Sequence, residues 1–312
     1  MASVSIQAHD FSVDGIYYNI LDGNNVEVTF KGSHVNQYVN EYINSINIPN
    51  EVTINNTTYT VTRVGDGAFY ACRTLNSVTI PNSVTYIGDT AFYSCDDLTT
   101  VDIGNAVTRI GDGAFFRCSF LSSITIPNSV TRIGNRAFKY CYSMTSVNIG
   151  SSVTEIGEEA FDGCTILSSV TIPNSVINIG AMAFQGCTYM TSVVIGNNVA
   201  NMMGSYGNCY NITMAACGRN VINMRNAYQN CHNIRGNMYM YSTKVSNMSN
   251  CFKNGKSKSN MLNIYVTQNS TSFNTCLKTS SSQSITGTSI TWTDDYATNS
   301  CYYNTTYNYY IY

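Results

Sequence analysis

Charged side chains are scarce in this chain of 312 residues. Asp, Glu, Lys and Arg together make up 11% of it, where an average soluble protein has about 25%. Histidine is rarer still, with three copies that lie far apart in the sequence and in no metal-binding or catalytic spacing. We therefore predict no enzyme activity, no catalytic residue, no metal and no cofactor.

Long apolar runs are missing as well. No segment approaches the roughly 20 apolar residues that a membrane-spanning helix needs. The first residues, Met1 to Ile6, have neither the charged part nor the apolar part of a secretion signal. These absences predict no membrane insertion and no export through the general secretory route.

The few charges are unevenly distributed. Residues 1–162 hold 8 basic and 16 acidic side chains, whereas residues 163–293 hold 8 basic and no acidic ones. A positive field attracts polyanions and weakens with salt, so the second segment is a candidate surface for an acidic glycan or an acidic protein patch. The basic residues are too sparse to favour nucleic acid. The candidates are Arg219, Arg225, Arg235, Lys244, Lys253, Lys256 and Lys258.

What the chain does have is a 23-residue period. A phenylalanine recurs at that spacing six times, and a cysteine follows three positions after each one. A fixed period of this length is typical of a solenoid, in which each coil buries its apolar face against the next. The phenylalanines are Phe69, Phe92, Phe115, Phe138, Phe161 and Phe184.

One repeat, residues 75–95, predicts how a coil folds. Val78 and Ile80 alternate with polar residues, as in a strand with one wet face, and the proline that follows ends the strand. Ala91, Phe92 and Cys95 fall at the spacing of a short helical turn. In later repeats the residue after the strand alternates between proline and glycine, which favours duplication in pairs, although drift without consequence explains it equally well.

The twelve cysteines would suggest disulfides in an exported protein. Six of them occupy one repeat position, which predicts a column of buried free thiols acting as small apolar side chains. Cys209 and Cys231 continue that column. The state of four others stays open: Cys217, Cys251, Cys276 and Cys301.

Residues 170–187 read Val-Thr-Ile-Pro-Asn-Ser-Val, then Ile-Gly and Ala-Phe-x-x-Cys. This pattern resembles the Treponema-type, BspA-like leucine-rich repeats over residues 48–199, and residues 201–255 are similar to a related shorter repeat. The resemblance implies an α/β repeat solenoid, a leucine-rich-repeat rod with short parallel strands, short helical turns and β-rich caps. It also implies a non-enzymatic role in surface adhesion or recognition.

The sequence predicts four segments. These are an N-terminal β cap (1–47) containing a hairpin, the regular repeats (48–199), degenerate Asn/Met/Tyr-type repeats (200–256), and a C-terminal β-rich segment (257–312). The last is either a cap or an attachment segment, because dense tyrosine suits a contact surface. Its tyrosines are Tyr302, Tyr303, Tyr307, Tyr309, Tyr310 and Tyr312.

A second candidate surface is an aromatic strip. Tyr70, Tyr93 and Phe116 follow the core phenylalanine in three successive repeats, and such strips bind sugars and peptides through flat apolar faces. The alternative, that these rings pack on their own turns, stays open.

The leading hypothesis is a surface adhesion protein that binds a protein or a glycan of a cell surface or of mucus. Because relatives on bacterial surfaces are exported, the absence of a signal favours assembly in the cytoplasm and exposure on a bacteriophage virion, as a fibre or decoration subunit, with a trimer left open. A bacterial cell surface or the extracellular space is the alternative location. The rival function is a purely architectural subunit of a virion or an intracellular scaffold that binds only its assembly partners.

Overall fold

The computed structural model describes residues 9–32, 40–232, 236–242, 244–247 and 251, together with the backbone of three further strands, 257–266, 290–294 and 303–311. The chain forms two compact units, residues 1–153 and 154–312. Both are built from β-solenoid coils of about 23 residues, which confirms the repeat solenoid predicted from the sequence.

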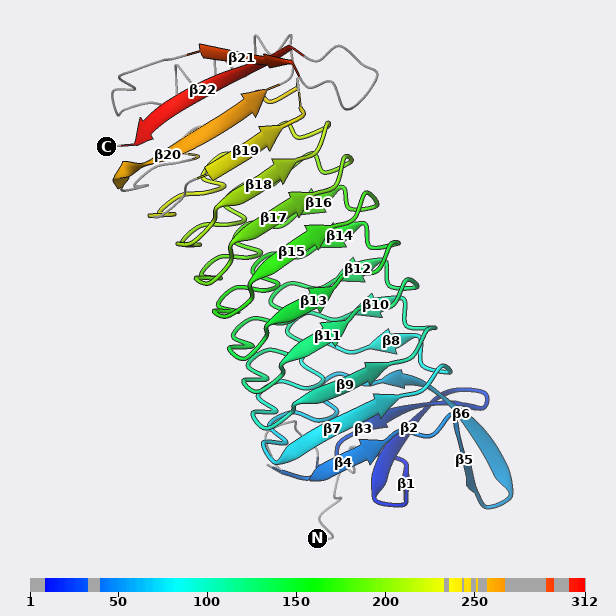
Figure 1. Cartoon of the computed structure of the whole chain (residues 1–312). Helices are drawn as coiled ribbons and strands as arrows, with labels where there is room; N and C mark the ends of the chain where they lie inside the picture. The colour runs from blue at the N-terminus through cyan, green and yellow to red at the C-terminus, as the bar shows by residue number, and fades with distance from the viewer. Residues whose placement is uncertain are drawn as a thin grey trace, which may run out of the picture. The chain divides into compact units, whose positions relative to one another are not determined.

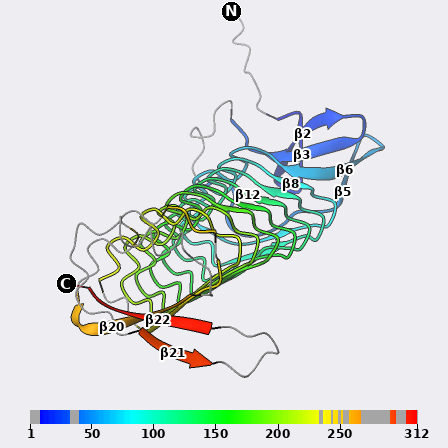
Figure 2. The same cartoon turned by 90° about the horizontal axis from the view of Figure 1, so that it is seen from above.

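The first unit begins with antiparallel strands. β1 (Phe11–Val13), β2 (Ile16–Asp22) and β3 (Asn25–Thr29) form a meander, so the expected hairpin is present. β3 then pairs in parallel with β6 (Thr57–Val64), which also forms an antiparallel hairpin with β5 (Glu51–Ile54). Figure 2 shows β2, β3, β5 and β6 grouped at the N-terminal end of this unit.

Each following coil of the first unit contributes a longer and a shorter strand. Figure 1 shows the longer strands side by side, with the shorter ones behind them. Both sets are parallel and in register every 23 residues, except that β4 pairs with β7 at an offset of 31 to 32 residues. The longer strands are β4 (Asn44–Asn47), β7 (Leu75–Ile80), β9 (Thr100–Ile103), β11 (Ser123–Thr125) and β13 (Ser146–Asn148). The shorter ones, which continue the sheet from β6, are β8 (Tyr86–Ile87), β10 (Arg109–Ile110) and β12 (Arg132–Ile133).

The second unit repeats this plan and closes it with antiparallel strands. Its longer parallel strands are β15 (Ser169–Ile172), β17 (Ser192–Ile195), β18 (Met214–Cys217), β19 (Gly236–Met240) and β20 (Ser257–Val266). β22 (Tyr303–Ile311) runs antiparallel to β20, and β21 (Ile290–Asp294) runs antiparallel to β22. On the shorter side, β14 (Glu155–Ile156) and β16 (Asn178–Ile179) are followed by single bridges between asparagines.

The core is a stack of aromatic rings. In the first unit, successive centroids from Phe69 to Phe138 lie 4.8, 4.9 and 5.2 Å apart with ring planes within 5° of parallel. In the second unit, the stack from Phe161 through Phe184 continues into Tyr206 and Tyr228. These rings are fully buried. Because neighbouring strands lie about 4.8 Å apart, the ring spacing is the coil spacing.

The cysteines form a second buried column beside the rings. The Cys95 thiol donates to the carbonyl oxygen of Phe69 in the preceding coil at 3.0 Å, and Cys118 donates to that of Phe92 at 3.2 Å. All ten cysteines in the described residues are free and buried, which confirms the predicted thiol column and adds Cys217 and Cys251 to the free thiols. Cys276 and Cys301 lie outside the described residues.

The expected helical turns are wrong, because the described residues contain no helix. Thr90 and Ser94 have φ values of 52° and 54°, whereas an α-helix requires about −63°. The N–H of Phe92 donates to the carbonyl of Ala114 in the next coil at 2.7 Å. The Ala-Phe-x-x-Cys segment is therefore a chain of turns whose N–H groups bond alternately within the coil and to the next coil, and its inward positions only imitate helical spacing.

The glycines that follow the longer strand have a steric cause. A Cβ built on Gly104 would lie 2.3 Å from the carbonyl oxygen of Pro81, and one on Gly150 would lie 2.2 Å from that of Pro127. Real Cβ atoms do not approach oxygen so closely. Close approach to the preceding coil therefore requires glycine at these points, and it does so above a glycine as well, because a Cβ on Gly218 would lie 2.0 Å from the carbonyl oxygen of Gly196.

We expect replacement of Gly196 by alanine to destabilise the fold by about 1–3 kcal/mol, as overpacked sites do, because the new Cβ would lie 2.3 Å from the oxygen of Pro173. Gly207→Ala is the matched control, since its nearest contact would be 3.6 Å away. Urea unfolding of the two variants measures the difference. Equal midpoints for Gly196→Ala and the wild type would contradict the steric explanation.

The buried thiols also predict a loss of stability at alkaline pH. Burial raises the pKa of Cys72 from 9.0 to about 11 and that of Cys217 to about 12. The folded state therefore holds these protons more tightly than the unfolded state. Their contribution is complete below the unfolded pKa, near pH 9, and is lost between about pH 9 and 12. Urea unfolding in reducing buffer should give a free energy of unfolding that is constant up to about pH 8 and falls above pH 9. A free energy of unfolding that stays constant to pH 11 would contradict this prediction.

Candidate binding surface

Five aromatic side chains form a continuous line on one corner of the first unit, which we call the aromatic ribbon: Tyr70, Tyr93, Phe116, Tyr140 and Tyr142. The first three stack with centroids 4.8 and 4.7 Å apart and planes within 2° of parallel. Phe116 then meets Tyr140 edge to face at 5.5 Å, and Tyr140 stacks on Tyr142 at 5.7 Å. All five are partly or largely exposed. The structure thus joins the three strip residues singled out in the sequence to two more.

The stacking determines which parts of the aromatic rings a ligand can contact. Both faces of the Tyr93 ring are covered, one by Tyr70 and the other by Phe116. A sugar ring stacks on a flat aromatic face, and neither face of Tyr93 is available for such a contact. The ribbon presents ring edges and hydroxyl groups instead, which is the amphipathic kind of contact that aromatic residues make in protein interfaces.

Sequence reasoning missed three exposed aromatic residues that lie one or two positions after the repeat cysteine. Phe120 is 56% exposed and Tyr142 45% in the first unit, and Tyr189 is 63% exposed in the second. Polar residues such as Thr74 and Asp97 occupy these positions in other repeats. A large apolar residue in place of a polar one is the signal that could have found them.

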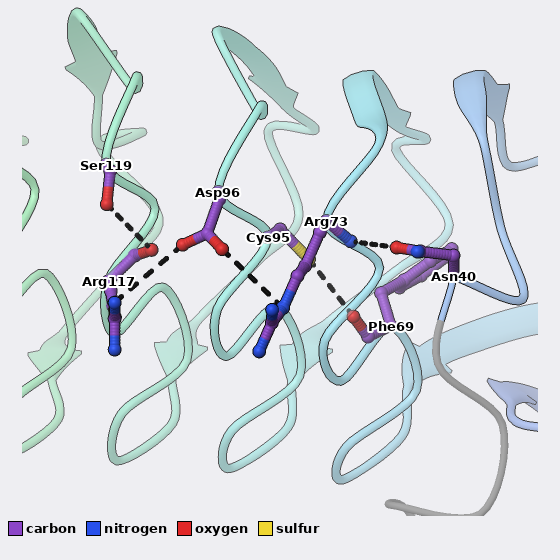
Figure 3. Close-up of polar contacts among 7 residues, drawn as sticks. All are labelled: Asn40, Phe69, Arg73, Cys95, Asp96, Arg117 and Ser119. Atoms are coloured by element: carbon purple, nitrogen blue, oxygen red, sulfur yellow. Dashed lines mark hydrogen bonds and ion pairs between the residues drawn. The ribbon is translucent and has the colours of Figure 1, made fainter.

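A polar network occupies the same corner in the first coils (Figure 3). The Asp96 carboxylate lies between two arginines, 3.7 Å from Nε of Arg73 and 3.8 Å from Nε of Arg117. The Asn40 side chain accepts a hydrogen bond from the Arg73 backbone at 2.7 Å. Exposed ion pairs of this kind contribute only about 0–1 kcal/mol. The network mainly fixes the direction of the two guanidinium groups.

The described basic side chains of the second unit lie at two corners of the coils. Arg219 and Lys244 share a corner, where Nζ of Lys244 donates to the Asn220 side chain at 2.7 Å. Arg225 follows the Asn223 bridge and lies at the next corner of its coil. The other candidates fall outside what can be described: Arg235, Lys253 and Lys256 lie in undescribed segments, and Lys258 is described in its backbone alone, within β20.

The C-terminal tyrosines lie largely in one strand. Tyr303, Tyr307, Tyr309 and Tyr310 belong to β22, which is described in its backbone alone. Tyr302 and Tyr312 lie outside the described residues. As an attachment interface they remain a prediction.

In the described part of the chain, no three His, Cys, Asp or Glu side chains come together in a way that could hold a metal ion. Within the same residues, no helix is long and apolar enough to cross a membrane.

The family model of the BspA type leucine rich repeat region matches the chain over residues 34–167 and 155–282. Because this match covers more than half of the sequence, the chain belongs to the BspA-type leucine-rich repeat family. No curated protein matches it.

Several solved structures are similar. A leucine rich cell surface protein from Faecalibacterium prausnitzii is 24% identical, with 77% of this chain and 80% of that one covered and a TM-score of 0.48. A leucine rich repeat protein of T. pallidum is 24% identical, with coverage of 70% and 90% and a TM-score of 0.46. One from Bacteroides ovatus is 23% identical, with coverage of 78% and 80% and a TM-score of 0.42.

Proposed function

We propose that this chain is a non-enzymatic recognition protein whose outer corner binds a protein partner on a cell surface. The observation that carries the proposal is the exposed aromatic ribbon, whose five rings are partly stacked, together with the exposed Phe120. These rings are not needed to fill the core, which has an aromatic column of its own. Membership of a repeat family built for binding rather than chemistry supports it.

The chemistry of the ribbon favours a protein over a glycan at this corner. Interface centres are enriched in tyrosine, phenylalanine and arginine, and the ribbon supplies the first two while Arg73 and Arg117 flank it. Because the rings hold one another in place, little side-chain entropy remains to be lost when a partner binds.

A finer proposal places the chain on a bacteriophage virion, as an exposed fibre or decoration subunit, attached through the tyrosine-rich strand β22. What supports it is the position of β22, which is paired with β20 and β21 at the C-terminal end of the second unit. The basic corner around Arg219 and Lys244 is a secondary candidate for an acidic glycan or an acidic partner.

The proposed binding corner predicts the effect of removing its two most exposed rings, Tyr142 of the ribbon and Phe120. The double variant Phe120→Ser, Tyr142→Ser should lower binding of the labelled chain to whole bacterial cells at least tenfold, because interface aromatics often contribute more than about 1.4 kcal/mol each. Ile177→Ser removes a side chain of similar exposure, 49%, away from this corner and should bind like the wild type. Flow cytometry measures the binding of both variants to the cells. If the double variant binds as well as the wild type, the ribbon is not the binding surface.

The virion proposal predicts that the chain co-purifies with phage particles on a density gradient and that antibodies against its coils block adsorption to cells. Antibodies that label the particle without blocking adsorption would instead support an architectural subunit. Finding the chain on the envelope of uninfected cells, and not on particles, would place it on the bacterial surface.

A further inference from the structure

A groove opens in the first unit where three neighbouring longer strands end. It lies at the carboxyl ends of β4, β7 and β9, as the chain turns into the proline corner, and has a volume of about 410 Å³. Small-molecule sites in proteins typically measure about 300–1,000 Å³. The groove therefore has room for a small ligand, and it lies at a different part of the coil from the aromatic ribbon.

The glycine of the third coil opens the groove. The first two coils place Pro49 and Pro81 at this corner, and the third has Gly104, where no side chain fits beside the Pro81 carbonyl. Beside this glycine, Ile103 is partly exposed and Asp102 is exposed, and both line the groove. The proline and glycine alternation thus shapes the surface as well as the stacking.

One wall of the groove is a row of three different polar groups. Asn47, Thr79 and Asp102 are in register on adjacent parallel strands, so an amide, a hydroxyl and a carboxylate follow one another at about 4.8 Å intervals. All three side chains are exposed. None has a side-chain hydrogen bond or ion pair with another described residue, whereas the threonine hydroxyls at Thr85 and Thr99 bond to the preceding coil. The row is therefore available to a ligand.

The other wall is apolar. The rings of Pro49 and Pro81 line it and are partly exposed, and the partly exposed Ile103 lies at its end. In the corresponding row of the next two coils, Thr125 and Asn148 stand where Asp102 stands here, so Asp102 is the one carboxylate in this row of the first unit.

This combination selects among ligand classes. An anion would be repelled by Asp102, and a free cation would find a single carboxylate to pair with. Sugar hydroxyls both donate and accept hydrogen bonds, so they match an acceptor-only carboxylate beside an amide and a hydroxyl that do both. The C–H face of a sugar ring can cover the proline wall.

From these features we propose that the groove binds a neutral sugar residue of a glycan through Asn47, Thr79 and Asp102, with the prolines packing against its apolar face. The proposal deepens the surface-recognition function, on which it rests, by giving a carbohydrate a site separate from the protein-binding ribbon.

Calorimetric titration of the full chain with neutral oligosaccharides tests it, using trimers of glucose, galactose, mannose and N-acetylglucosamine. We expect at least one trimer to bind with an affinity unchanged between low and high salt, because a neutral ligand releases no counterions. Asp102→Ala should weaken that binding at least tenfold. Asp97→Ala is the matched control, an exposed carboxylate of the same coil on the ribbon corner, and should have no effect.

A second pair of variants tests the groove by filling it. Thr79→Trp should abolish sugar binding, whereas Thr125→Trp, at the same position of a coil beyond the groove, should not. Both positions are exposed, so the fold tolerates either side chain. The proposal is overturned if no trimer binds the wild type, or if Asp102→Ala and Thr79→Trp bind sugar as well as the wild type does. Binding of a lysine-rich peptide that Asp102→Ala abolishes, without sugar binding, would overturn it as well.

The ribbon variant separates this result from the broader function. Phe120→Ser, Tyr142→Ser should keep sugar binding in calorimetry even though it loses binding to cells. Loss of sugar binding in that variant would show that the groove is not an independent site.

Discussion

Like side chains from successive coils must lie directly over one another at the distance that the backbone hydrogen bonds impose. Strands pair at about 4.8 Å, and the buried phenylalanines accept that spacing as a near-parallel ring stack of 4.8 to 5.2 Å. The cysteine beside each ring adds a polar requirement, because its thiol must reach the carbonyl of the coil before it. A coil that shifted by one residue would lose the ring contact and the thiol bond together, so the 23-residue period is enforced by two columns at once.

The same constraint governs the outside of the molecule. A residue that recurs at an outward position becomes a column too, as Tyr70, Tyr93 and Phe116 show. Stacking then removes ring faces from solvent and leaves edges, so a regular strip is less suited to sugars than an isolated ring would be. The two proposed recognition features instead lie where the repeat is broken, at Phe120 on one corner and at Asp102 on another. Departures from the consensus are therefore the places to look for function in such a protein.

Much of the fold was predictable because the period is visible in the residues themselves. Phe92 and Cys95 identify the buried columns, and the polar alternation around Val78 identifies the longer strand. The sequence predicted a helical turn where the structure has a chain of tight turns. The positive φ values at Thr90 and Ser94 leave no signature in the residue types that would distinguish these turns from a helix. The aromatic strip was visible, but its covered faces and its continuation to Tyr142 depend on distances between coils. The groove was hidden for another reason: the hairpin insertion separates the paired residues of the first two coils by 32 positions instead of 23, so the row that ends at Asp102 cannot be read from the period.

The thiol column also determines where such a chain can acquire its structure. Every described cysteine is reduced and engaged with its neighbours in the core, so no covalent cross-link among them has to form or be sorted before the coils close. Neither an oxidant nor a disulfide isomerase is needed for that part of the molecule to fold, and a reducing environment does not destabilise it. Protein produced in the cytosol of an ordinary expression host should therefore have the same core as protein kept under oxidising conditions.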